Sequence, residues 1–251
     1  MISEDQIKTW YHCNKLYQLD GNIVNYDPSQ LLVFTTIKDI YLLIIKNKLK
    51  DFDKDLFYLI QLNLHKLYKD LSTLDDAQYL TNYAISLIYK YFQKFPLNTF
   101  TPVLVNYNPE LFYKHHKYSI SYDVILRQNN KSGFIHGICF SVDLNSHFKS
   151  NDLFMYPKLE FLKNLITKKR GSHPFTRIHF LSFKPASFRN KNQRGYRLSI
   201  YTKTEKDITN IHLEKFYKLL EFFFENINLQ TIKPFCMETT CPKRKDCLYE
   251  N

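Results

Sequence analysis

Glycine is scarce in this chain, with only 5 glycines among 251 residues. Nucleotide-binding loops of the GxGxxG and GxxxxGK[ST] types need several glycines, and neither motif occurs. Long apolar runs are also missing, since the most apolar stretch, Leu42–Ile45, is far shorter than the ~20 residues of a membrane-spanning helix. The opening Ser3–Gln6 is polar and acidic, unlike a secretory signal. We therefore expect an intracellular, cytoplasmic protein with neither a glycine-rich nucleotide loop nor a membrane partner.

Acidic residues are too few to balance the basic ones. The chain has 24 Asp and Glu against 35 Lys and Arg, which gives a formal net charge of +11. A chain this basic suits a polyanion, so we expect DNA as a partner. Codon usage offers a second explanation, because Lys, Asn, Ile, Tyr and Phe are all abundant, as in proteins of AT-rich genomes such as those of phages or small-genome bacteria. The charge alone leaves open a module that binds only other proteins.

Cysteine is limited to five residues, but their distribution is informative. Cys13 lies near the start, whereas Cys236, Cys241 and Cys247 crowd into the last sixteen residues. The fifth, Cys139, sits in an apolar run and suits a small core position. The other four can meet only if the two ends of the chain fold together. In a reducing compartment such a set favours zinc or an iron–sulfur cluster over disulfides.

The apolar periodicity predicts a single α+β domain. Residues 1–100 are expected to be mostly helical, 101–204 to form a core sheet with one helix, and 205–251 to form a terminal helix and a cysteine tail. Ser3 and Gln6 form a capping box for the first helix. The expected strands cover residues 101–107, 111–117, 118–127, 134–142, 177–183 and 196–202. The expected helices cover the start of the chain, most of 35–94, a segment ending near 169, and 205–226.

Two terminal motifs resemble those of RecB/AddB-type PD-(D/E)XK nucleases of the iron–sulfur branch. The pattern S-x-x-Q-x-x-x-W-x-x-C-x-x-x-Y over residues 3–17 resembles the opening of the AddB nuclease domain and of the CRISPR-adaptation exonuclease. The pattern C-x4-C-P-K-R-K-D-C over residues 236–247 resembles the terminal cluster motif. The resemblance implies a restriction-endonuclease-like core, a mixed central sheet flanked by helices, whose ends are joined by a [4Fe–4S] cluster.

The ligands that this resemblance implies are Cys13, Cys236, Cys241 and Cys247. The first spacing of the terminal motif, x4, departs from the x2 that is commoner in the family. Zinc therefore stays open as the alternative metal.

The family's nuclease chemistry uses an Asp on the second core strand, a (D/E)-x-K motif on the third, a preceding His, and a Tyr on the next helix. By position, Asp123 matches the first acid, His116 (or His115) the His, and Tyr156 the Tyr. In the third strand, residues 134–142, the resemblance places the acid near His136 or Gly137 and the lysine near Cys139, but the strand has neither a carboxylate nor a lysine. Without that pair, Mg²⁺ or Mn²⁺ has too few oxygen ligands beside the scissile phosphate. The resemblance thus predicts a degenerate nuclease, in which these three residues are vestigial.

We therefore expect a nuclease-like protein that binds DNA or scaffolds a replication, repair, recombination or mobile-element complex. One alternative is an active metal-dependent exonuclease with a non-standard site, for instance Asp123 with His136 and Asp143. Mg²⁺ or Mn²⁺ is expected only in that case. A second alternative is a protein–protein interaction module without nucleic-acid binding.

A basic loop is the candidate surface for nucleic acid. Cationic side chains beside aromatic ones can hold a single strand through phosphate contacts and stacking. A polar hairpin tip with no binding role is the ordinary alternative. The candidate contacts are Lys184, Arg189, Lys191, Arg194 and Arg197.

Overall fold

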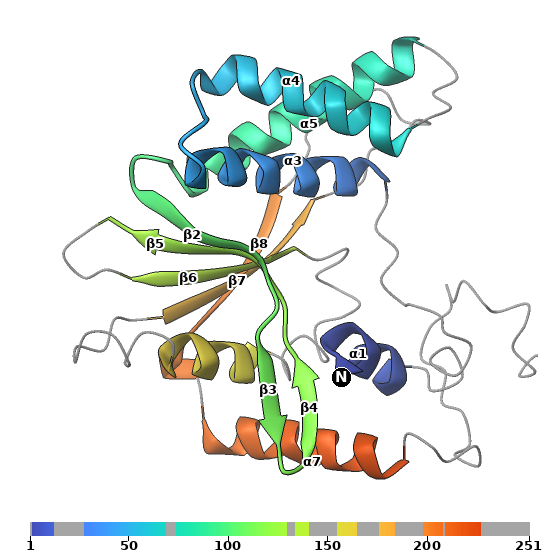
Figure 1. The fold of residues 1–251 in the computed structure, drawn as a ribbon, viewed down its shortest axis with the longest axis vertical. Helices are drawn as coiled ribbons and strands as arrows, with labels where there is room; N and C mark the ends of the chain where they lie inside the picture. Colours follow the sequence, from blue (N-terminus) through green and yellow to red (C-terminus); the bar gives the residue numbers. More distant parts are fainter. Residues whose placement is uncertain are drawn as a thin grey trace, which may run out of the picture.

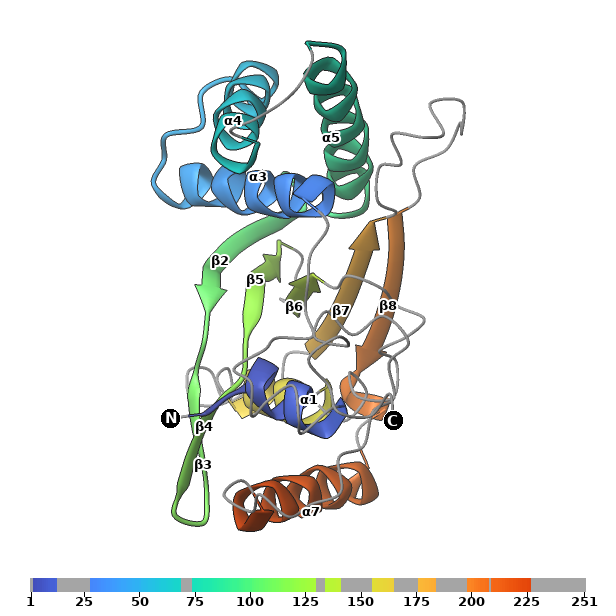
Figure 2. The same ribbon diagram turned by 90° about the vertical axis from the view of Figure 1, so that its right-hand side faces the viewer.

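The structure, a computed structural model, describes residues 2–12, 28–68, 74–129, 134–140, 155–164, 176–183, 198–207 and 209–226. A five-stranded mixed sheet lies at the centre of these residues. One face is covered by the helices α3, α4 and α5, and the other by the helical segment 155–164, α1, α7 and a small second sheet (Figures 1 and 2). This arrangement confirms the α+β class and the mixed central sheet flanked by helices.

The central sheet has the strand order β2-β5-β6-β7-β8. The pairs β2–β5, β5–β6 and β7–β8 are antiparallel, and β6–β7 is parallel. A helical segment over residues 155–164 lies between β6 and β7 in the chain. Three antiparallel strands, a helix and a parallel strand follow one another as expected from the sequence. The strands are β2 (Phe100–Tyr107), β5 (Tyr122–Gln128), β6 (Ile135–Phe140), β7 (Thr176–Phe183) and β8 (Leu198–Thr204).

The helical layer consists of α3 (Pro28–Ile45), α4 (Phe52–Leu67) and α5 (Leu74–Lys94). Its contact with the sheet includes the rings of Phe34 and Phe140, stacked with centroids 4.4 Å apart. The prediction of helix within 35–94 is confirmed, although α3 begins earlier. The apolar spacing of residues 56–71 predicts that Phe57 is buried, but this prediction is wrong, since Phe57 is 54% exposed. Its neighbours Leu56, Leu59 and Ile60 already fill the buried stripe of α4.

The second face carries a smaller sheet of order β1-β4-β3. The expected single strand over 111–117 is wrong, because the chain reverses at Lys114, whose φ is 52°. The expected strand over 118–127 is likewise divided, with a break at 120–121. The elements of this side are β1 (Ile2–Ser3), α1 (Glu4–His12), β3 (Glu110–Tyr113), β4 (His116–Ser119), η1 (Glu205–Asp207) and α7 (Asn210–Asn226).

The first and last described helices pack against each other. The Trp10 ring lies 5.6 Å from the Phe222 ring and 5.1 Å from the Phe223 ring, centroid to centroid. The capping box of α1 forms as expected: the Ser3 amide donates to Gln6 Oε1 at 2.8 Å, and the Gln6 amide donates to Ser3 Oγ at 3.2 Å. The start of the chain is thus fixed beside the helix that precedes the cysteine tail.

Among the described residues, no helix combines the length and the apolar content needed to cross a membrane.

Candidate functional site

Asp123 lies at the start of β5 and bridges two elements. Its Oδ2 accepts a hydrogen bond from the Phe140 amide of β6 at 2.7 Å, and its Oδ1 is 3.3 Å from the Lys38 ammonium nitrogen of α3. Both carboxylate oxygens are therefore engaged by protein groups. About a quarter of the side chain remains exposed.

Glu4, in the first turn of α1, is the second carboxylate at this end of the sheet. Its Oε1 lies 2.6 Å from Lys8 Nζ and 2.9 Å from Lys158 Nζ. Its Oε2 accepts hydrogen bonds from the Ser121 amide at 2.9 Å and from the Ser121 hydroxyl at 3.3 Å. A carboxylate at a helix N-terminus is also favoured by the helix dipole. Glu4 is consequently held from three elements while being almost fully buried.

Lys158 projects from the helical segment 155–164 into the same place. Its ammonium group donates to Cys139 Sγ at 3.4 Å, in addition to the Glu4 ion pair. The ammonium nitrogen is 5.7 Å from the Tyr122 ring and 5.5 Å from the Phe180 ring, which adds cation–π attraction. Cys139 is buried, as expected of a small core residue. It also occupies the strand position at which the resemblance would place the catalytic lysine.

Electrostatics keep Glu4 and Lys158 charged. Burial acts to raise the pKa of Glu4, but attraction by Lys158 and Lys8 outweighs it and lowers that pKa to about 2. Burial acts to lower the pKa of Lys158, and the opposing influence of Cys139 and Glu4 raises it above its ordinary value. Burial raises the pKa of the Cys139 thiol to about 11 in spite of Lys158, so the thiol is neutral at pH 7.

Asp5 adds a third acidic group to this region. Although the surface of Asp5 is exposed, the dense packing of atoms around it raises its pKa; the charge of Lys8 opposes this rise, and the charges of Glu4 and Asp123 reinforce it. With Lys8, Lys38 and Lys158 opposite the three acids, the cluster is formally neutral without an added ion.

Sequence reasoning missed Glu4, Lys8, Lys38 and Lys158. For Lys158 a signal exists in the sequence: Met155, Leu159 and Leu162 form a buried stripe, and Lys158 occupies the i+3 position of that stripe. A lysine at an inward position of an apolar helix requires a buried acid. Which acid supplies the negative charge depends on the fold, since Glu4 lies near the start of the sequence and Lys158 lies in its second half.

The other two family-position candidates lie in different contacts. His116 lies in β4 next to the hairpin turn, and its ring stacks on Phe224 of α7 with centroids 4.0 Å apart. Tyr156 is buried and stacks on His212 at 4.1 Å. The structure joins each of them to α7, whereas the Asp123 oxygens meet Lys38 and Phe140.

The opposite face of the sheet carries a buried histidine pair. His136 Nδ1 lies 2.8 Å from His179 Nε2, and His179 Nδ1 lies 2.8 Å from Thr202 Oγ1. Burial lowers the pKa of His136 to about 4 and that of His179 to about 3, so both rings are neutral at pH 7. The His136 side chain thus pairs with His179 on the face of the sheet opposite to Cys139. This position argues against His136 as a metal ligand beside Asp123 in a non-standard site. Asp143 lies outside the described residues.

The cysteine set and the basic loop also lie outside the described residues. This applies to Cys13, Cys236, Cys241 and Cys247, and to Lys184, Arg189, Lys191, Arg194 and Arg197. Over the part of the chain that is described, no three His, Cys, Asp or Glu side chains are grouped as metal ligands. The sulfur site therefore stays a prediction from the sequence.

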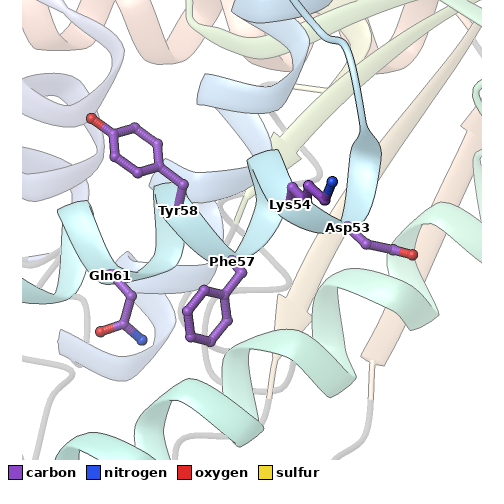
Figure 3. Close-up of a pocket in the computed structure, with 5 residues that line it drawn as sticks. All are labelled: Asp53, Lys54, Phe57, Tyr58 and Gln61. Carbon is purple, nitrogen blue, oxygen red and sulfur yellow. The ribbon is translucent and has the colours of Figure 1, made fainter.

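A shallow hollow of ≈ 550 Å³ lies on the outer surface of α4 (Figure 3). Its walls all come from one helix, and α4 lies beyond α3 from the sheet (Figures 1 and 2). It is separate from the Asp123 region. The lining residues are Asp53, Lys54, Phe57, Tyr58 and Gln61.

Comparisons with known proteins give structural matches alone. No family profile matches the chain, and no curated protein matches it. A candidate exonuclease from Eubacterium rectale matches with 11% identity and a TM-score of 0.47, over 98% of this chain and 87% of that one. The protein SSO0001 matches with 14% identity and a TM-score of 0.30, over 65% of this chain and 69% of its own. Both TM-scores are below 0.5, so the fold description above rests on this chain's own strands and helices.

Proposed function

We propose that this chain is a nuclease-like protein without hydrolytic activity that binds DNA, as part of a replication, repair, recombination or mobile-element complex. The observation that carries the proposal is the state of Asp123, whose two oxygens are bound by Lys38 and by the Phe140 amide. Strand β6, where the second acid and the lysine are expected, has the sequence IHGICF. A divalent ion would have to displace Lys38 and would still lack a second carboxylate from that strand.

The net charge of +11 supports a polyanionic partner. Phosphate contacts by Lys and Arg release counterions, so the affinity for DNA should fall steeply as salt rises. The basic loop with Lys184, Arg189, Lys191, Arg194 and Arg197 is the proposed contact surface.

A second candidate is an active exonuclease in which Glu4 and Lys158 replace the missing strand residues. The observation in its favour is that Lys158 Nζ reaches Cys139, at the position expected for the catalytic lysine. Against it, both side chains are only 2% exposed and neutralise each other. Substrate phosphate would have to enter a site that is closed by α1.

The deciding experiment incubates the purified chain with labelled single- and double-stranded DNA in MnCl₂ and follows both binding and degradation. We expect binding that weakens as KCl is raised, with no degradation. Degradation that Asp123→Ala abolishes would establish the active enzyme instead. DNA binding that is absent, or that does not change with salt, would establish the protein-interaction module.

The proposed cofactor is a [4Fe–4S] cluster, with zinc as the alternative, on Cys13, Cys236, Cys241 and Cys247. Support comes from the packing of Trp10 against Phe223, because α1 ends next to Cys13 and α7 leads into the tail that carries the other three. Thiolates are the usual protein ligands of both centres.

Anaerobic absorbance spectra with iron and zinc analysis test this cofactor. We expect the metal to be lost in Cys13→Ser and retained in Cys139→Ser, the matched control at a buried cysteine. A metal-free wild-type chain purified without oxygen would rule the cofactor out.

A further inference from the structure

Two carboxylates lie near the start of β5, Asp123 of β5 itself and Glu4 of α1, and each contacts at least one lysine ammonium group. Glu4 Oε1 contacts both Lys8 and Lys158, and Asp123 Oδ1 contacts Lys38. The lysines come from α1, from the helical segment 155–164 and from α3, so the positive charge is delivered from three sides. Burying a carboxylate without such a partner is strongly unfavourable.

Nuclease-like cores usually neutralise such acids with a divalent cation held by carboxylate oxygens. Here the two ammonium groups on Glu4 carry the same total charge as one such ion. They differ from it in being covalently part of the chain, so they cannot exchange with solvent.

We propose that Lys158, together with Lys8, is the built-in cation of this site: the two ammonium groups take the part of a divalent metal ion at Glu4, and Lys158 positions Glu4, and with it α1, on the sheet. This inference rests on the proposed function in assuming that no metal ion binds at Asp123. Lys158 is a positioning residue in this account, because it acts through Glu4.

The surroundings of Lys158 fit a fixed ammonium group. Each of its close partners accepts or attracts positive charge: the Glu4 carboxylate, the Cys139 sulfur and the faces of the Tyr122 and Phe180 rings. The Tyr122 hydroxyl also donates to the Lys158 carbonyl oxygen at 2.6 Å, which fixes the backbone from which the side chain extends. A metal ion would need oxygen ligands where these aromatic rings lie.

The test measures the melting temperature in MnCl₂ against KCl of equal ionic strength. We expect no Mn²⁺-specific shift for the wild-type chain. Lys158→Met should melt several degrees lower in both salts, because Mn²⁺ finds no further oxygen ligands among the Tyr122 and Phe180 rings. Lys117→Met is the matched control, because Lys117 forms an exposed ion pair with Glu110, and it should show no shift. A Lys158→Met chain that melts like the wild type, or an Mn²⁺-specific shift of the wild-type chain, would overturn the inference.

A second measurement does not depend on the folding of Lys158→Met. Mn²⁺ binding to the wild-type chain and to Asp123→Asn can be compared by titration followed by electron paramagnetic resonance. We expect no Mn²⁺-binding site that is present in the wild-type chain and absent from Asp123→Asn. Such a site would overturn the inference. The proposed function fails separately, through DNA degradation or through the absence of salt-dependent binding, so the two failures are distinguishable.

Discussion

The Tyr122 hydroxyl donates a buried hydrogen bond of 2.6 Å to the carbonyl oxygen of Lys158. It connects β5 to the helical segment 155–164 at the residue whose side chain pairs with Glu4. The backbone and the ammonium group of Lys158 are therefore fixed by different elements, β5 and α1. This arrangement makes the Glu4–Lys158 pair a rigid part of the core.

Removing the charge of Glu4 should strongly destabilise the fold. Glu4→Gln leaves Lys158 buried and unpaired, and losing one partner of a buried ion pair costs about 3–5 kcal/mol. Urea denaturation gives the free energy of unfolding. Glu110→Gln is the matched control: its pair with Lys117 is about half exposed, so the change should cost only about 0–1 kcal/mol. Equal losses in both variants would contradict the role assigned to Glu4.

The free energies of unfolding of the wild-type chain and of Glu4→Gln, measured by urea denaturation, should also depend differently on pH. The lowered pKa of Glu4 means that the unfolded chain takes up a proton first as pH falls below its ordinary value of 4.5. The stability from this group is thus complete above pH 4.5 and is lost as pH falls to about 2. The Gln variant lacks this component, so the gap between the two unfolding free energies should narrow over that window.

The histidine pair predicts a second, higher window of acid sensitivity. His136 and His179 are neutral in the fold, with lowered pKa values of about 4 and about 3, whereas unfolded histidine titrates near 6.5. Stability should be complete above pH 6.5 and fall as the pH drops towards 4, by at most about 1.4 kcal/mol per pH unit for each ring.

Urea denaturation at pH 7.5, 6.0 and 5.0 measures this dependence. His179→Gln should reduce the slope, because it removes one of the two titrating rings. The same unfolding free energy at pH 7.5 and pH 5.0 in the wild-type chain would refute this assignment.

Gly137 should not tolerate a side chain. A Cβ atom there would lie 2.9 Å from Leu162 Cδ1 and 3.0 Å from Tyr122 Cδ1. The Tyr122 ring is anchored by its hydroxyl and cannot move aside easily, so Gly137→Ala should cost about 1–3 kcal/mol through overpacking. Because Leu162→Val shortens one clashing side chain, the double variant should lose less than the sum of the single losses. Strict additivity of the thermal unfolding data would contradict this packing.

The contact between the first and last described helices should be worth several kcal/mol. Trp10→Ala removes a buried ring that touches Phe222 and Phe223, and such truncations cost about 3–5 kcal/mol. Hydrogen exchange should accelerate in both α1 and α7. Phe112→Ala, at a side chain that is 72% exposed, should change stability by less than about 0.5 kcal/mol. Faster exchange in α1 alone would show that α7 does not depend on this contact.

Local signals in the sequence were enough for the fold class and for most of the element order. The capping box at Ser3 and Gln6, the apolar stripe of α5 and the short β-branched runs act within a few residues, so they can be found without a fold. The sequence also identified Asp123 as an acid in the second core strand. It failed at the β3–β4 hairpin, because a turn at Lys114 requires a positive φ that the residue type does not indicate.

Only the tertiary structure decided which charges meet. Glu4, Lys38, Asp123 and Lys158 lie far apart in the chain, and no single segment indicates which residue is the partner of its charge. Their pairing arises because the sheet brings α1, α3 and the helical segment 155–164 to the same end of β5. A buried charge is stable only next to its partner, and that proximity is a property of the packed elements rather than of any segment of the sequence.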